Sequence, residues 1–237
     1  MKSLSSGARS FAYGTGGIAR KAALVLLTVL SCVTAAATAS AQDRITIAAL
    51  GDSLTQGYGL SPEDGFVPRL EEWLQANGHG EVEVINAGVS GDTTAGGLAR
   101  IDWTLSDDVD AVIVALGGND VLRGIDPGTS RDNMEGILAA VDARGLPALI
   151  AGMQAPGNYG PDYKQKFDAI FPDLAEAYDA ILYPFFLQGL SGEEGGDLTG
   201  VRDLMQGDGI HPNAQGVRRI VEDIGPYVAR LVERARS

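Results

Sequence analysis

Ile45-Thr46-Ile47-Ala48-Ala49-Leu50-Gly51-Asp52-Ser53-Leu54-Thr55 is the stretch that decides the fold. The near-continuous apolar run from Ile45 to Leu50 is typical of a short strand that is covered on both faces. Gly51 can adopt backbone angles that are closed to other residues, so the chain can turn sharply where the strand ends. That turn would place Ser53 at the carboxyl end of a central strand, where open α/β sheets bind their ligands. A serine at this place is either a helix cap or a nucleophile, and the rest of the chain decides between them.

The first 41 residues have the composition of an export signal. Four basic residues and no acidic ones occur there, an apolar run covers residues 22–30, and small residues lead up to Ala41. This order predicts a signal peptide at 1–41 that is cleaved after Ala41, because the apolar run is too short to span a bilayer. The protein is therefore expected in the periplasm or secreted. The alternative is a lipoprotein box at 29–32, with Cys32 as the acylated residue.

Residues 42–237 fit one domain, with no internal repeat and no linker. Cys32 is the only cysteine, so the domain has neither a disulfide nor a thiolate for catalysis or zinc binding. The net charge of the whole chain is −13, and loss of the four leader cations makes it −17. This balance argues against nucleic acid and anionic membrane surfaces as partners.

Strand patterns alternate with helix patterns along this domain, which predicts a parallel sheet covered on both faces. Strands are expected at 45–50, 81–85, 110–116, 147–153 and 180–186. Helices are expected at about 62–76, 94–105, 129–143, 163–178 and 213–236. A glycine- and acid-rich loop from Gly189 to Gly207 is longer than a compact domain usually carries without a purpose.

Unusual residues follow three of the expected strands. Ser53, Gly91 and Asn119 each lie just beyond a strand, and the carboxyl ends of parallel strands share one edge of the sheet. Of the two histidines, His79 precedes a strand and belongs to the opposite edge, in a solvated loop. His211 therefore remains as the base, and Asp208, three residues before it, can orient its ring. Ser53, Asp208 and His211 then form a catalytic triad.

Acyl transfer also needs hydrogen-bond donors for the developing oxyanion. The candidates are the backbone N–H groups of Ser53 and Gly91 and the side-chain amide of Asn119. Taken alone, Gly91 and Asn119 are equally well explained as turn residues. Their occurrence together with a possible triad favours the catalytic interpretation.

These residues lie in four blocks whose order and spacing resemble the SGNH (GDSL-type) hydrolases. The blocks are Gly51-Asp52-Ser53-Leu54, Gly88-Val89-Ser90-Gly91-Asp92-Thr93, Gly117-Gly118-Asn119-Asp120 and Asp208-Gly209-Ile210-His211-Pro212. Two further segments, at 119–124 and 154–160, resemble the periplasmic multifunctional thioesterase/lysophospholipase/arylesterase subgroup. The resemblance implies a flavodoxin-like three-layer α/β/α fold with a five-stranded parallel sheet of order 2-1-3-4-5. It also implies the triad and the oxyanion contacts given above.

The resulting prediction is a serine esterase that cleaves short to medium acyl esters, such as aryl esters and lysophospholipids, and acyl thioesters. Leu122, Ile125 and Pro156 are expected to contact the acyl group. No metal or other cofactor, no nucleic-acid partner and no stable membrane span are expected, and the protein is expected to be a monomer. The alternatives are a carbohydrate O-acetyl esterase and a non-catalytic, flavodoxin-like anion-binding module. The first is disfavoured because Trp73 and Trp103 both occupy expected helix-core positions.

Overall fold

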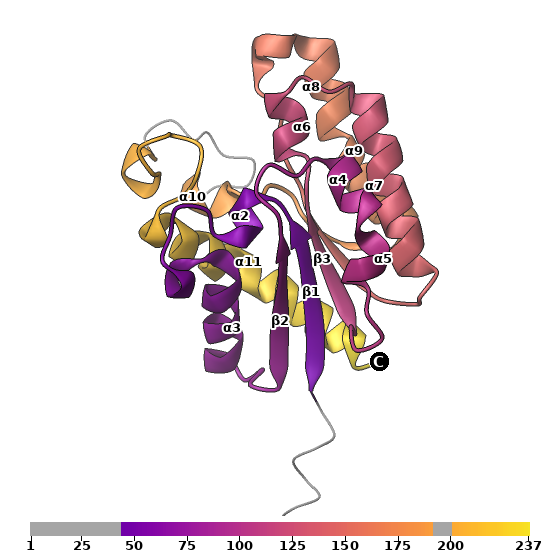
Figure 1. Cartoon of the computed structure of the whole chain (residues 1–237), viewed down its shortest axis with the longest axis vertical. Coiled ribbons are helices and arrows are strands. Elements are labelled where there is room, and N and C mark those ends of the chain that lie inside the picture. Colours follow the sequence, from indigo (N-terminus) through magenta and orange to yellow (C-terminus); the bar gives the residue numbers. More distant parts are fainter. Residues whose placement is uncertain (1–43, 192–200) are drawn as a thin grey trace, which may run out of the picture. The chain divides into compact units, whose positions relative to one another are not determined.

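A five-stranded parallel sheet organises the fold, with strand order β2-β1-β3-β4-β5 (Figure 1). The strands are β1 (Ile45–Gly51), β2 (Val82–Gly88), β3 (Ala111–Ala115), β4 (Ala148–Ala151) and β5 (Ile181–Tyr183). The order reverses direction after β1, which leaves a crevice at the carboxyl ends of β1 and β3. The predicted α/β class, the number of strands and their order are confirmed.

The computed structural model describes residues 44–191 and 201–237. Arg44–Ser237 forms one unit of the chain. The predicted signal peptide at 1–41, with Cys32, lies outside the described residues, as do residues 192–200 of the acid-rich loop. No helix of the described residues is long and apolar enough to cross a membrane.

Burial along the strands explains their sequence patterns. Every residue of β1, β3 and β4 is buried, whereas the two edge strands alternate between buried and more exposed positions. Central strands are covered by helices on both faces, so an unbroken apolar run is stable there. The apolar run of β3, Ala111–Ala115, is the centre of the core.

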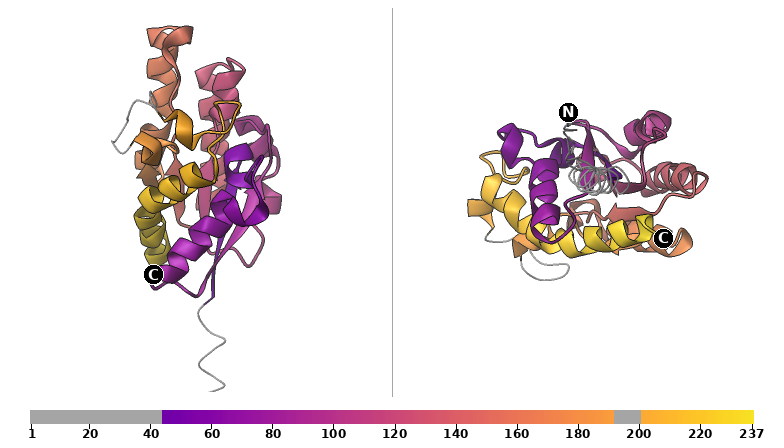
Figure 2. Two further views of the ribbon diagram at one scale, coloured as in Figure 1. Left: turned by 90° about the vertical axis from the view of Figure 1, so that its left-hand side faces the viewer. Right: turned by 90° about the horizontal axis from the view of Figure 1, so that it is seen from below.

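Helices cover both faces of the sheet (Figure 2). On one face α3 (Phe66–Ala76) packs against α11 (Ala214–Ala235), which crosses β3, β4 and β5. On the other face lie α4 (Thr94–Ala99), α5 (Ile101–Thr104), α7 (Pro127–Asp142), α8 (Pro161–Asp168) and α9 (Ile170–Ala177). The short helices α2 (Ser53–Gln56) and α6 (Gly118–Leu122) begin where β1 and β3 end.

The helix expected at 94–105 is broken at Arg100, and this overturns one prediction. Arg100 leaves the helical conformation, with φ −119° and ψ 8°, so α4 ends and α5 begins there. With the helix broken at this point, Trp103 of α5 is 90% exposed instead of lying in the core. Trp73 is packed, as expected, against Gly225 of α11.

Other boundaries also differ from the expectation, and β2 continues to Gly88, three residues beyond the strand expected at 81–85. The strand expected at 180–186 is only three residues long, because the chain leaves the sheet at Pro184. The helix expected at 163–178 is two helices, and Pro172 lies in the first turn of α9, where its missing N–H is tolerated. The helix α10 (Gln188–Ser191) occupies the start of the segment predicted as a loop.

Candidate active site

The turn between β1 and α2 presents Ser53. Asp52 caps α2 by accepting a hydrogen bond from the Leu54 N–H at 3.0 Å, so Ser53 is the first residue of the helix. The turn needs a glycine at Gly51, because a Cβ atom there would lie 2.0 Å from Oγ1 of Thr55. Thr55 is itself buried under the turn. The strand end, the cap and the packed threonine together fix the position of the Ser53 hydroxyl.

Ser53, His211 and Asp208 form a hydrogen-bonded chain. Ser53 Oγ lies 2.8 Å from His211 Nε2, and His211 Nδ1 lies 2.6 Å from Asp208 Oδ2. His211 reaches the site from the loop before α11, and its ring lies 4.7 Å from the ring of Tyr58. The three residues predicted as a triad thus lie together, with His211 in contact with each of the other two.

Asp208 is held as a carboxylate. The hydrogen bond to the His211 ring, and then the backbone N–H groups of His211 and Ile210 at 3.0 and 2.9 Å, lower the pKa of Asp208 below its usual range. An ionised carboxylate only accepts hydrogen bonds, so Nδ1 of His211 is the donor in this pair. Nε2 is then the basic nitrogen, and it faces the Ser53 hydroxyl.

The three predicted oxyanion donors border the same cleft as Ser53 Oγ. Ser53 begins α2, so its N–H has no acceptor within that helix. Gly91 has φ 82°, a left-handed conformation that favours glycine. Asn119 is the second residue of α6. Ser53, Gly91 and Asn119 all line the cleft.

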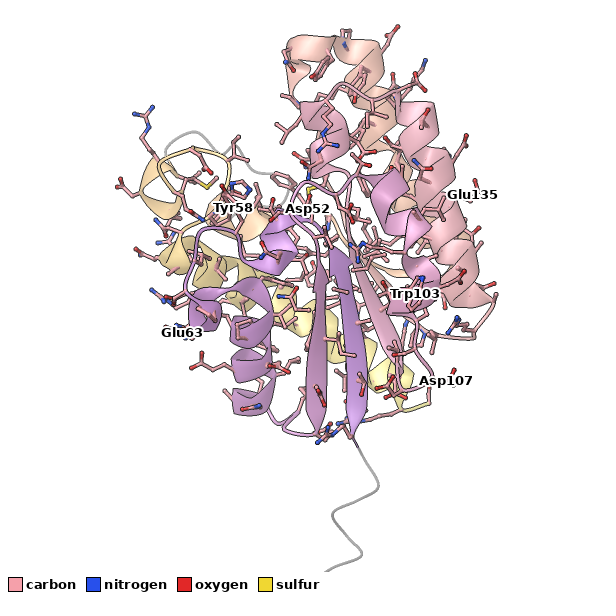
Figure 3. The ribbon with its side chains drawn as sticks, viewed as in Figure 1. Asp52, Tyr58, Glu63, Trp103, Asp107 and Glu135 are labelled. Atoms are coloured by element: carbon pink, nitrogen blue, oxygen red, sulfur yellow. The ribbon has the colours of Figure 1, made fainter. Side chains whose placement is uncertain are left out.

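Asp52 contacts one of these donors directly. Asn119 Nδ2 donates to Asp52 Oδ2 at 3.1 Å, while the other carboxylate oxygen receives the Leu54 N–H. The side chain is buried, and this burial is the main reason that the pKa of Asp52 rises to about 6. Figure 3 shows Asp52 near the carboxyl ends of the strands, with Tyr58 close by.

Asp120 fastens the helix that carries Asn119. Its fully buried carboxylate accepts hydrogen bonds from Thr94 N at 2.9 Å, Thr94 Oγ1 at 2.5 Å and Ser130 Oγ at 2.9 Å. These contacts join α6 to the beginnings of α4 and α7. The helix that carries Asn119 is therefore anchored to α4 and α7 by buried hydrogen bonds.

Two arginines brace the loops around the site. Arg100 donates to Asp92 Oδ2 at 2.7 Å, to the Ala87 carbonyl at 2.8 Å and to the Gly51 carbonyl at 2.9 Å. Arg123 donates to the Gly91 carbonyl at 2.7 Å. The five N–H donors of the planar guanidinium group point outward in fixed directions, which suits Arg to holding several acceptors at once.

The cleft beside Ser53 has a volume of about 580 Å³ and a mainly apolar lining. Of the predicted acyl contacts, Leu122 and Pro156 are in this lining. Ile125 is not in the lining: it is half-buried, and its carbonyl oxygen accepts a hydrogen bond from the Tyr163 hydroxyl at 2.8 Å. Val121, which precedes Leu122, also lines the cleft. Apolar residues in the lining that the sequence analysis did not propose as substrate contacts are Leu54, Tyr58, Met153, Phe185, Leu187, Met205 and Ile210.

The sequence contained a pattern that could have identified some of these missed lining residues. Met153, Phe185 and Leu187 follow the ends of β4 and β5, and strand ends gather at the same edge as Ser53. The contribution of Tyr58 and Met205 depends on loop conformations that no periodic pattern encodes. The roles of Asp52 and Arg100 are visible only once their hydrogen-bond partners are known.

His79 lies before β2, at the amino end of that strand and outside the cleft lining, as the sequence predicts. It is half-buried, however, and not in a fully solvated loop, and its backbone N–H donates to the Leu74 carbonyl of α3 at 2.9 Å. Among the described residues there is no group of three or more His, Cys, Asp or Glu side chains that could hold a metal ion.

Comparisons with known proteins agree with this geometry. Residues 49–219 match the model of the GDSL-like lipase/acylhydrolase family. The chain is 36% identical to the esterase TesA of Pseudomonas aeruginosa over 89% of this chain and 99% of that protein. It is also 36% identical to thioesterase 1/protease 1/lysophospholipase L1 of Escherichia coli K12, over 81% of this chain and 82% of that protein.

A solved structure is also similar to this chain. The SGNH-hydrolase family esterase AlinE4 superposes with a TM-score of 0.65 at 44% identity, covering 81% of this chain and 98% of its own. A family match across most of the domain, relatives aligned nearly end to end and a shared fold all agree. The chain belongs to the GDSL-like lipase/acylhydrolase family, the SGNH hydrolases.

Proposed function

We propose that this protein is a serine esterase that hydrolyses short to medium acyl carboxylic esters, including aryl esters and lysophospholipids, with acyl thioesters as a further substrate class. The observation that carries the proposal is the Ser53 hydroxyl held 2.8 Å from the basic nitrogen of His211, beside an apolar cleft. A hydroxyl in that contact can be deprotonated as it attacks. The apolar lining suits an acyl chain.

In the acylation step, Ser53 Oγ bonds to the ester carbonyl carbon while its proton moves to His211 Nε2. The carbonyl oxygen becomes an oxyanion, for which the N–H groups of Ser53 and Gly91 and the Asn119 amide are the donors. When the tetrahedral intermediate collapses, the alcohol or thiol leaves with the proton from His211. Asp208 stabilises the imidazolium in between.

Deacylation repeats these transfers with water. His211 Nε2 takes a proton from the water as its oxygen attacks the acyl carbon. The carboxylic acid is released, and the proton returns to Ser53 Oγ. The chemistry needs no group from outside the chain except water.

The experiment that tests this proposal combines hydrolysis with labelling. Ser53→Ala should remove about 10⁴-fold or more of kcat for p-nitrophenyl butyrate, since a triad without its nucleophile keeps only a residual rate. An alkyl p-nitrophenyl phosphonate should label the wild type once per chain and leave the folded Ser53→Ala protein unlabelled. Unchanged turnover by Ser53→Ala would disprove the acyl-enzyme route, and an unlabelled, inactive wild type would instead favour an anion-binding module.

The carbohydrate O-acetyl esterase remains the alternative within hydrolases. The exposure of Trp103 does not favour it, because that residue lies on α5, outside the cleft lining and away from Asp52 (Figure 3). Acetylated xylan and p-nitrophenyl acetate, compared with p-nitrophenyl octanoate, distinguish the two substrate classes.

The place of action proposed for the enzyme is the periplasm or the medium. The support for this is the basic, apolar and small-residue order of residues 1–41. Fractionation of cells expressing the full chain, followed by N-terminal sequencing of the active protein, tests both the location and the cleavage after Ala41.

A further inference from the structure

The side chain of Asn119 has two chemically different ends, and only one of them can serve an oxyanion. Its amide nitrogen donates two hydrogen bonds, whereas its oxygen only accepts. If the amide were rotated by half a turn, a lone pair would face the developing negative charge and repel it. Catalysis by Asn119 therefore requires something that selects one orientation of the amide.

The neighbour that makes this selection is Asp52. Its Oδ2 atom receives one N–H of Asn119 Nδ2 at 3.1 Å. Burial raises the pKa of Asp52 only to about 6, so at neutral pH the side chain is a carboxylate that accepts and cannot donate. The reversed amide would place its oxygen against this carboxylate, and two acceptors at that distance repel each other.

The second carboxylate oxygen keeps Asp52 from turning away. Oδ1 accepts the Leu54 N–H at 3.0 Å and so caps α2, the helix on which Ser53 stands. The surroundings are also close, because a Cβ atom on Gly118 would lie 3.2 Å from Oδ2. One buried side chain thus contacts both the helix of the nucleophile and the amide of the oxyanion donor.

We propose that Asp52 is a positioning residue that orients the Asn119 amide, so that the second N–H of Nδ2 faces the oxyanion. This inference rests on the proposed function. The benefit of Asp52 does not come from direct contact with the oxyanion, because a negative charge beside an oxyanion would oppose the reaction. Its benefit is delivered through Asn119.

The test is a double-mutant cycle with p-nitrophenyl butyrate. Asn119→Ala removes one oxyanion donor, for which a fall in kcat of about 10²- to 10³-fold is expected. Asp52→Asn keeps the size and can still cap α2, but presents a donor to one of its two partners. We expect it to lower kcat about tenfold or more, with KM changed less than about threefold.

The diagnostic measurement is the double variant. If Asp52 acts through Asn119, Asp52→Asn should change kcat by less than about twofold once Asn119 is alanine. The same large loss in both backgrounds would overturn the proposal, as would full activity of Asp52→Asn alone. Ser53→Ala separates this outcome from the proposed function, since a turnover dependent on Ser53 but indifferent to Asp52 disproves only the positioning role.

Two controls separate positioning from folding. Asp126 is a second helix-capping aspartate, which accepts the Gly128 N–H at 2.9 Å on α7 outside the cleft lining, so Asp126→Asn should retain wild-type kcat. Asp52→Ser can still cap α2 but is too short to reach Asn119, and it should lose kcat as Asp52→Asn does. Thermal unfolding of each variant checks that it is folded at the assay temperature, and a folded Asp52→Ser with full activity would also contradict the proposal.

Discussion

Asp52 carries an energetic cost, because its ionised form is buried. Desolvation is the largest cause of its raised pKa, and the negative charge of Asp92 adds to it. The hydrogen bonds from Leu54 and Asn119 and the charge of His211 only partly offset these effects. The folded state therefore holds a proton on Asp52 more tightly than the unfolded chain does, between pH 3.8 and about 6.

This cost gives a prediction for stability. As pH rises through that window the folded wild type loses stability, whereas Asp52→Asn has no proton to lose there. Relative to wild type, the free energy of unfolding of Asp52→Asn should therefore rise between pH 4 and pH 7.5, by up to ~3 kcal/mol for a shift of about two pKa units. Urea unfolding of both proteins at the two pH values measures it. A difference that does not change with pH would contradict the prediction.

Asp208 changes stability with pH in the opposite direction to Asp52. Its pKa is lowered by His211, so the stability that it contributes is present above its ordinary value of 3.8 and is lost as pH falls below that value. The pH 4 to 7.5 comparison lies above this range, and Asp208 is common to both proteins. Asp208 therefore does not obscure the effect of Asp52.

At the scale of elements, α2 rests directly on the end of β2. A Cβ atom on Gly88 would lie 2.4 Å from the backbone nitrogen of Gln56 and 2.9 Å from the Asp52 carbonyl oxygen. Backbone atoms cannot rotate aside as a flexible side chain can. The absence of a side chain at Gly88 therefore sets how closely the helix of Ser53 approaches the sheet.

Gly88→Ala should displace α2 and the Ser53 hydroxyl with it. We expect a destabilisation of about 1–3 kcal/mol, as for other overpacked sites, and a fall in kcat that exceeds any change in KM. Gly80→Ala is the matched control, since nothing lies within 4 Å of the added Cβ atom there. Urea unfolding and steady-state kinetics measure both effects, and equal behaviour of the two variants would refute the close-approach argument.

The sequence predicted the elements best where one physical rule dominated. The fully buried strands β1 and β3 are recognisable in the sequence as apolar runs. The alternation of strands with helices along the chain predicts the parallel sheet. The order β2-β1-β3-β4-β5 came from the family resemblance, because no local pattern encodes which strands are neighbours. The prediction that Ser53 meets His211 did not come from a local pattern either. It depended on placing the strand ends at one edge of the sheet.

Errors arose where a tertiary contact overrode the local pattern. The helical periodicity across 94–105 gives no warning of the break at Arg100, because the cause is three acceptors on other segments. Trp103 was misplaced for the same reason. Ile125 follows Asn119 closely in sequence, but Gly124, with φ 62°, turns the chain away before it reaches the cleft.

At the scale of the whole molecule, the apolar cleft should determine which esters are preferred. Each methylene group buried there contributes up to ~0.8 kcal/mol, so two carbons can raise kcat/KM about tenfold. We therefore expect p-nitrophenyl esters of medium chains to be cleaved faster than the acetate. Leu122 is 58% exposed at the cleft, and Leu122→Ala should narrow this gap.

The measurement is kcat/KM against acyl length for wild type, Leu122→Ala and Trp103→Ala. Trp103→Ala also removes an exposed apolar side chain, but one outside the cleft lining, so its chain-length profile should match that of wild type. A strong preference for acetate that Leu122→Ala leaves unchanged would favour the O-acetyl esterase instead.

The two residues that share the catalytic proton are 158 positions apart in the chain. Ser53 follows the first strand and His211 precedes the last helix, so their contact closes a loop that spans most of the domain. Contacts of such long range form late and slowly in folding, whereas helices form from local contacts. During refolding from urea, far-ultraviolet circular dichroism should thus recover before hydrolysis does. Regained turnover would time the moment at which the two ends of the domain meet.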